Sequence, residues 1–137
     1  MSEADLQKLE AFLQRAPYIR FLGMRAELAG DEMTAVLPFS QHLVGNTMIP
    51  ALHGGVIGGF LEATALAQLW VTQDTGKLAK TIDVTIEYLR PGRAMTTYAR
   101  ADLRKVGRRV ANVHVEAWQE ARDTPVAALR GHFLLAD

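Results

Sequence analysis

The 137-residue chain contains no cysteine. Disulfides, thiolate nucleophiles and cysteine-ligated metal sites are therefore excluded. An excess of charge of one sign is also missing, because 15 lysines and arginines balance 15 aspartates and glutamates. A balanced chain gives no global electrostatic reason to expect nucleic acid or an anionic membrane as a partner.

A long apolar run and a secretory leader are missing as well. The apolar stretch at 54–71 is interrupted by Glu62, Gln68 and several glycines, and it falls short of the ~18 uncharged residues of a membrane span. The segment at 1–17 is charged and amphipathic and lacks the apolar centre of a signal peptide. We therefore expect a cytoplasmic protein without a membrane-spanning segment.

What is present fits one globular domain over residues 1–137. Hydrophobic residues make up 49% of the chain and charged residues 22%, which is typical of folded domains. A chain of this length buries roughly two thirds of the surface that its unfolded form exposes. It can therefore hold a core without disulfides or metals.

Hydrophobic periodicity predicts a helix, two strands, a second helix and four strands. The first helix is expected at 4–15 and the second at 54–72. One long helix beside an antiparallel sheet is an α+β arrangement. The strands are expected at 20–28, 32–39, 79–89, 94–105, 108–119 and 125–135, with a loop at 40–52 and turns at 29–31, 73–76, 90–92, 106–107 and 122–124.

Two strand segments carry further expectations. In the strand at 79–89, simple alternation places Ile82, Val84, Ile86 and Tyr88 on one face. The strands at 94–105 and 108–119 are longer than is needed to cover one helix. We therefore expect them to pair across a subunit boundary in an oligomer.

The apolar run at 54–72 predicts a helix that is buried on nearly every side. Gly58 and Gly59 weaken a helix, so we expect them to allow the close approach of another backbone. The only ionisable side chain of the run is Glu62. Glu62 is a structural carboxylate within the core, or the helix is less buried than its composition suggests, or the carboxylate is functional.

The start of this helix has the geometry of an oxyanion site. The N–H groups of Gly54, Gly55 and Val56 are expected to lack acceptors and to carry partial positive charge. The two glycines would let a substrate carbonyl approach closely. Glu62 lies eight residues beyond Gly54, about 12 Å along the helix axis. Two antiparallel copies of the helix in a two-fold dimer would set the glutamate of one chain opposite the glycines of the other.

The sequence His53-Gly54-Gly55 followed by Glu62 resembles the motif of hotdog-fold acyl-CoA thioesterases of the phenylacetic-acid-pathway and 4-hydroxybenzoyl-CoA type. The resemblance extends over residues 20–136 and leaves the N-terminal helix at 1–17 as an addition. It implies a curved antiparallel sheet wrapped around one central helix, assembly into homodimers or homotetramers, and hydrolysis of an acyl-CoA thioester.

The resemblance assigns roles to the residues of the motif. The Gly54 N–H would polarise the thioester carbonyl, and Gly55 would support that turn. Glu62 of the partner chain would act as nucleophile or general base, a point on which family members differ. His53 would shape the start of the helix through hydrogen bonds rather than perform chemistry.

Two polar residues outside the helix also resemble family positions. Asn46 is similar to a loop asparagine that places the attacking water or the thioester, although it lies seven residues before His53 and six is the familiar spacing. Thr81 aligns with a strand hydroxyl that could orient water. Alternatively, it is simply a good strand former.

Coenzyme A would enter as part of the substrate, with no separate cofactor and no metal. Its phosphates favour arginine side chains and backbone N–H groups, although basic residues at turns are also explained by solvation. The candidate contacts to coenzyme A are Arg104, Lys105, Gly107, Arg108 and Arg109, with Arg90 and Arg93 at a second turn. The candidate acyl contacts, which core packing would also explain, are Leu43, Val44, Met48, Ile49, Phe60 and Leu61.

Two other functions remain open. A hotdog hydratase or dehydratase would act on enoyl or hydroxyacyl thioesters, and the sequence EATALAQ at 62–68 resembles such enzymes. Those enzymes pair a histidine with an acidic residue, but His42 lies twenty residues before Glu62 and outside their motif. The other possibility is a non-catalytic acyl-CoA binder.

Overall fold

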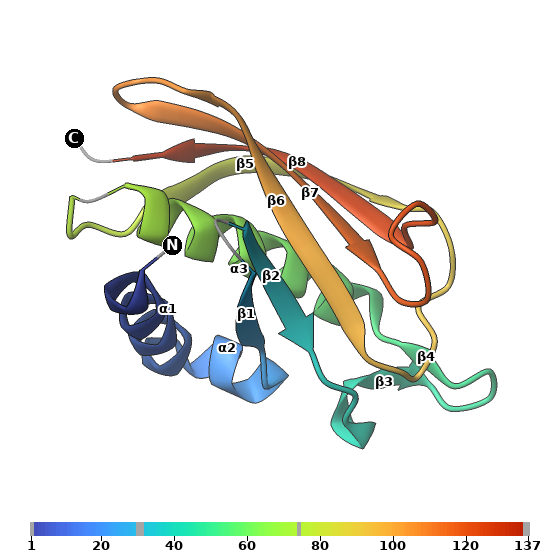
Figure 1. Ribbon diagram of the computed structural model, residues 1–137. Coiled ribbons are helices and arrows are strands. Elements are labelled where there is room, and N and C mark those ends of the chain that lie inside the picture. Colours follow the sequence, from blue (N-terminus) through green and yellow to red (C-terminus); the bar gives the residue numbers. More distant parts are fainter. Residues whose placement is uncertain (1, 30–31, 74, 136–137) are drawn as a thin grey trace.

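A six-stranded antiparallel sheet wraps around one long helix in the computed structural model (Figure 1). The structure describes residues 2–29, 32–73 and 75–135. The turns predicted at 29–31 and 73–76 lie partly outside the described residues. The described residues form helices and an antiparallel sheet, which confirms the predicted α+β class.

The elements follow one another from α1 to β8 along the chain. The helices are α1 (Glu3–Arg15), α2 (Pro17–Leu22) and α3 (Gly54–Thr72), with a single 3-10 turn η1 (Gln41–Leu43). The strands are β1 (Arg25–Ala29), β2 (Glu32–Leu37), β3 (Val44–Asn46), β4 (Ala51–Leu52), β5 (Lys80–Tyr88), β6 (Thr97–Val106), β7 (Val110–Trp118) and β8 (Ala127–Leu134). The main sheet has the order β1-β2-β6-β7-β8-β5, and β3 pairs with β4 in a separate hairpin.

The predicted helix at 54–72 coincides with α3, and α3 forms the centre of the core. It contacts β5, β6, β7 and β8, and buried side chains alternate along β7 and β8. By length and composition α3 could span a membrane, but 56% of the relevant window is buried inside the molecule. Its apolar surface is therefore accounted for by core packing.

The N-terminal helix α1 packs against α3. The indole Nε1 of Trp70 donates a hydrogen bond to the Lys8 carbonyl at 3.2 Å, and Phe12 lies beside the same ring. At its start, the Ser2 N–H donates to the carboxylate of Asp5 and the Asp5 N–H donates to the Ser2 hydroxyl. This capping box holds the pKa of Asp5 below its usual value, mainly through the hydrogen bond that the Ser2 N–H donates to the carboxylate.

Two segments differ from their predicted structure. Residues 20–22 were expected in a strand but belong to α2. Pro17 occupies the start of that helix, where its missing N–H costs nothing, and Gly23 ends it with φ of 77°. The segment 40–52, expected as a loop, contains η1 and the β3–β4 hairpin.

Side chains, rather than another backbone, approach the two mid-helix glycines, so that prediction was wrong. A Cβ atom on Gly58 would lie 2.9 Å from Ile86 Cδ1 and 3.1 Å from Tyr88 Oη. A Cβ atom on Gly59 would lie 2.7 Å from the ring of Tyr18. The glycines therefore make room for side chains of α2 and β5.

A bulge in β5 inserts one residue into the strand. Thr81 pairs with Phe133 and Asp83 pairs with His132, so Ile82 has no partner of its own on β8. An extra residue shifts the alternation of a strand by one position.

This bulge decides which β5 side chains face α3. Ile82 is 53% exposed, which corrects its predicted place on the face with Val84 and Ile86. Because the bulge intervenes, Thr81 lies on the α3 side together with Val84 and Ile86, although its number is odd and theirs are even.

The long strands predicted at 94–105 and 108–119, now β6 and β7, pair with each other. β7 pairs along its length with β6 on one side and β8 on the other. On its other side β6 pairs with β2 only over residues 97–99, and the pairing of these strands across a subunit boundary stays a prediction. The edges of the main sheet are β1 and β5.

We predict that Gly131→Ala lowers the free energy of unfolding by about 1–3 kcal/mol, measured by urea denaturation. A Cβ atom at this position of β8 would lie 2.8 Å from the Asp83 carbonyl oxygen, in the bulge. Gly59→Ala is the matched control, because the three atoms nearest to its Cβ all belong to the side chain of Tyr18, which can rotate away. Gly131→Ala with wild-type stability would contradict a role for Gly131 in accommodating the bulge.

Candidate functional site

A histidine caps the start of α3. The backbone of His53 is extended, and its Nδ1 accepts the Gly55 N–H at 2.9 Å. Because an amide can only donate, Nδ1 carries no proton in this bond, and the proton of the neutral ring is on Nε2. The structure thus places His53 in a capping position, which is the structural role expected from the resemblance.

One N–H group at the helix start remains open. The N–H of Gly55 is bonded to the His53 ring, and those of Val56 and Ile57 are bonded to the His53 carbonyl. The prediction that Gly55 and Val56 lack acceptors was therefore wrong. The N–H of Gly54 has no acceptor within the helix and none among the other described residues, and Gly54 is exposed.

Strand β5 fixes the other side of the helix start. The Tyr88 hydroxyl donates a hydrogen bond to the Gly54 carbonyl at 2.8 Å. A cavity of about 310 Å³ opens beside these two residues, and its lining includes Ile57, Leu89 and Arg90. The open N–H group thus lies close to a cavity with apolar walls and one cation.

Glu62 lies half-buried on α3 and is hydrogen-bonded to β5. The Thr81 hydroxyl donates to Glu62 Oε2 at 2.6 Å. This bond depends on the bulge at Ile82, which turns Thr81 toward the helix. The second oxygen, Oε1, accepts no hydrogen bond from a described residue. The carboxylate is therefore held by one oxygen and leaves the other available.

Glu62 and Gly54 of one chain lie apart. Gly54 contacts Tyr88 and Glu62 contacts Thr81, positions that are seven residues apart in β5. The helical rise gives the same result, with a separation of about 12 Å along the α3 axis. One chain does not bring its own glutamate to its own open N–H group.

Asn46 lies in the β3–β4 hairpin next to the helix start. Its Oδ1 accepts the N–H groups of Met48 at 2.9 Å and Ile49 at 3.4 Å, so the side chain stabilises the hairpin turn. A Cβ atom on the neighbouring Gly45 would lie 2.8 Å from His53 Cα. The structure therefore brings Asn46 near the motif and uses its oxygen in a turn.

The predicted acyl contacts Phe60 and Leu61 are both fully buried in the core. Core packing, the alternative weighed from the sequence, accounts for both. Met48 and Ile49, by contrast, are 88% and 63% exposed at the hairpin tip.

The predicted coenzyme A contacts at the β6–β7 turn lie at the far end of the sheet from Gly54, whereas Arg90 of the second predicted turn lines the cavity beside Gly54. Lys80 and Val110 both pair with Leu134 at that end. Gly54, in contrast, contacts Tyr88 at the opposite end of β5. The residues at this β6–β7 turn are exposed, and Arg104 pairs with Asp102 at 2.8 Å. They are Arg104, Lys105, Gly107, Arg108 and Arg109.

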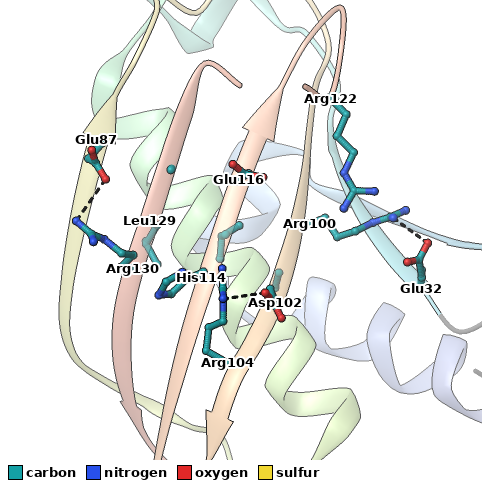
Figure 2. A pocket seen from close by; sticks show the side chains of 13 residues that line it. Glu32, Glu87, Arg100, Asp102, Arg104, His114, Glu116, Arg122, Leu129 and Arg130 are labelled. Atoms are coloured by element: carbon teal, nitrogen blue, oxygen red, sulfur yellow. Dashed lines mark hydrogen bonds and ion pairs between the residues drawn. The ribbon is translucent and has the colours of Figure 1, made fainter. Parts of the chain in front are cut away.

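A separate cavity of about 580 Å³ lies on the sheet face turned away from α3 (Figure 2). Its lining is charged in both signs and includes neither Glu62 nor Thr81. Three ion pairs neutralise much of it, namely Arg100–Glu32 and Arg104–Asp102, both at 2.8 Å, and Arg130–Glu87 at 3.4 Å. This face is therefore distinct from the surroundings of Glu62 and Gly54, although Arg104, a predicted coenzyme A contact, lies on it.

The histidine that a hydratase would need is engaged elsewhere. His42 Nε2 donates to the Phe21 carbonyl at 2.8 Å, and Nδ1 accepts from the Ser40 hydroxyl at 2.7 Å.

Within residues 2–29, 32–73 and 75–135, no three His, Asp or Glu side chains gather as metal ligands would.

Sequence reasoning missed two tyrosines at the helix start. The sequence placed Tyr88 on one face of the strand with Ile82, Val84 and Ile86 but not at Gly54, and it placed Tyr18 in no element of the site. Pro17 is the signal that could have found Tyr18, because proline favours the first position of a helix.

Comparisons with known proteins concern the family and the fold. Residues 50–126 match the family model described as the thioesterase superfamily. The medium/long-chain acyl-CoA thioesterase YigI of Escherichia coli (strain K12) is 32% identical over an alignment of 127 residues, and the match covers 81% of this chain and 81% of that one.

Solved structures are similar over nearly the whole chain. A protein from Chromobacterium violaceum is 40% identical, with a TM-score of 0.75 over 98% of this chain and 96% of that one. The E. coli PaaI protein, from the phenylacetic acid degradation operon, has a TM-score of 0.79 at 22% identity, covering 99% of this chain and 96% of that one. The latter similarity concerns the fold alone.

Proposed function

Because the chain belongs to the thioesterase superfamily, whose members hydrolyse thioester bonds, we propose that Glu62 and the Gly54 N–H form its active site for acyl-CoA hydrolysis. The observation that carries the proposal is the half-buried Glu62 carboxylate, held by Thr81 through one oxygen. The E. coli relative at 32% identity is named for medium- and long-chain acyl-CoA. We therefore place the substrate in that class.

The chemistry follows from the two groups. As a general base, Glu62 Oε1 takes a proton from water while the water oxygen attacks the thioester carbonyl carbon. The Gly54 N–H stabilises the negative charge that develops on the carbonyl oxygen. The intermediate then expels the coenzyme A thiolate, which receives the proton. As a nucleophile, Oε1 attacks the same carbon itself, and the C–S bond breaks to release the coenzyme A thiolate. Water then hydrolyses the resulting anhydride, which regenerates the Glu62 carboxylate, frees the acid and supplies the proton that the thiolate takes up.

Both mechanisms need the carboxylate in one orientation. Thr81 donates to Oε2, so this hydrogen bond fixes the side chain and directs the free Oε1 toward the substrate. Asn46 retains an amide N–H₂ group beside the helix start, which is suited to the attacking water or the thioester oxygen.

We propose that each active site is shared between two chains. β5 is a nine-residue edge strand, and a long exposed edge favours pairing with another chain. Antiparallel pairing of two β5 strands, with Thr81 of one near Tyr88 of the other, sets one Glu62 opposite the other Gly54. The two-fold axis generates two such sites.

The same pairing supports the predicted coenzyme A contacts. The β6–β7 turn lies at the Lys80 end of the sheet, and antiparallel pairing brings this end beside the Gly54 end of the partner. The turn would then bring Arg104, Lys105 and Arg108, with the Gly107 backbone, toward the phosphates of a substrate bound at the partner's Gly54.

A cytoplasmic location stays a prediction of the sequence.

Glu62→Gln should fold normally and lose hydrolysis by a factor of about 100 or more. The amide neither accepts a proton from water nor attacks a carbonyl. Release of free thiol from octanoyl-CoA measures the rate, and thermal unfolding checks the fold. Near-wild-type turnover of this variant would rule out the proposed mechanism, and coenzyme A binding with no hydrolysis by the wild type would indicate a non-catalytic binder.

Thr81→Val keeps the shape of the side chain and removes its hydroxyl. We expect kcat to fall about tenfold, the effect of losing one hydrogen bond to a charged group, with KM and stability little changed. Thr81→Ser is the matched control, because it retains the hydroxyl and should recover most of the rate. Equal loss in both variants would show that packing, and not the hydrogen bond, is responsible.

Gly54→Pro tests the open N–H and the shared site together. Proline suits the first helical position, His53 before it is extended, and a Cβ atom meets nothing closer than 3.6 Å. The variant should therefore fold and lose about 100-fold in rate.

Mixing Gly54→Pro chains with Glu62→Gln chains should restore about a quarter of wild-type activity. About half of randomly assembled dimers are hybrids, and each hybrid keeps one complete site. Chains are unfolded and refolded together before the assay, and each variant refolded alone is the control. A mixture no more active than its parts would contradict a site shared between chains.

A further inference from the structure

We infer that Tyr18 and Phe21 of α2, here called the aromatic pair, form a wall for the acyl chain and set the preference for its length. This inference rests on the proposed function, since it concerns the substrate of the same site. It assigns a substrate contact to a segment outside the motif that identifies the family.

The aromatic pair is not used by the core. On α2, Ile19 and Leu22 are buried, whereas Tyr18 and Phe21 are 48% and 51% exposed. Their rings stack with centroids 6.1 Å apart and planes 17° apart. Packing within the chain leaves about half of each side chain exposed, so the two adjacent rings form an apolar surface on this six-residue helix.

The pair lies at the start of α3, on the side that carries the glutamate. The Tyr18 ring packs against Gly59, and its hydroxyl lies 3.5 Å from the Gly55 carbonyl. Positions 55, 59 and 62 follow the i, i+4, i+7 spacing of one helix face. The pair is therefore beside the first turns of α3, where the thioester carbonyl is proposed to bind.

The two sides of the helix start differ in chemistry. On the β5 side, the cavity beside Tyr88 contains Arg90, and a cation suits the phosphate-bearing arm of coenzyme A. On the α2 side, the two exposed rings are uncharged. A chain of methylene groups gains most by leaving water for such an apolar surface. The geometry therefore directs the acyl chain toward α2 and the coenzyme A arm toward β5.

His42 holds the wall in place. Its ring meets Phe21 edge-on with centroids 4.6 Å apart, and its Nε2 donates to the Phe21 carbonyl at 2.8 Å. The Ser40 hydroxyl fixes the other ring nitrogen. A surface that is already ordered costs less to bind than one that must be ordered by the ligand.

The test is a chain-length profile of kcat/KM for wild type and Phe21→Ala, using butanoyl-, octanoyl-, dodecanoyl- and hexadecanoyl-CoA. A methylene fully removed from water is worth roughly fourfold in affinity. We therefore expect a loss of about tenfold for dodecanoyl-CoA, mainly in KM, which shrinks steadily toward butanoyl-CoA. Tyr18→Ala should change the profile in the same direction.

Tyr98→Ala is the matched control. Tyr98 also stacks on an aromatic ring, that of Trp118 at 6.0 Å, but it projects from the sheet face away from α3. Its profile should match the wild type. Inhibition by coenzyme A itself, which has no acyl chain, should be equal in Phe21→Ala and the wild type.

Three results would overturn the inference. The first is a loss that is uniform across chain lengths, and the second is an unchanged profile in both α2 variants. The third is dissociation of the oligomer by Phe21→Ala in sedimentation velocity, which would assign the pair to a contact with a second copy. If the wild type hydrolysed none of the series, the proposed function would fail, and this inference with it.

Discussion

The burial of α3 is the constraint on which the rest of the structure depends. A helix that is apolar on nearly every side can be stable only if other elements cover it, and the curved sheet, α1 and α2 do so. The one carboxylate on this helix, Glu62, must then find a polar partner. The fold supplies Thr81 at the margin of the core, so the carboxylate is hydrogen-bonded and still half-exposed.

The margin of the core is also where the regular pattern of the sheet is interrupted. The bulge at Ile82 shifts the alternation of β5 and turns Thr81 toward α3. The bulge in turn requires Gly131 on β8, because a side chain there would collide with the Asp83 carbonyl. A glycine that is far from Glu62 in the sequence, on the strand paired with β5, thus contributes to the position of the candidate catalytic carboxylate.

At the other end of the site, His53 and Gly54 have different roles. His53 satisfies the N–H groups of Gly55, Val56 and Ile57 and leaves that of Gly54 open. The open group and Glu62 lie too far apart in one chain to act together. The chemistry proposed for them therefore links catalysis to assembly through the β5 edge.

The sequence by itself determined the family, the hotdog arrangement of a sheet around a helix, and the limits of α3. These follow from the His53-Gly54-Gly55 motif with Glu62 and from a helical apolar run, which are local patterns, and they are confirmed. Only the tertiary structure decided that α2 is a helix, that Gly58 and Gly59 receive side chains, and that β5 is an edge strand of the main sheet. It also decided that Thr81 contacts Glu62. The physical reason is that strand register, bulges and helix docking depend on partners far away in the chain, and local composition does not encode those contacts.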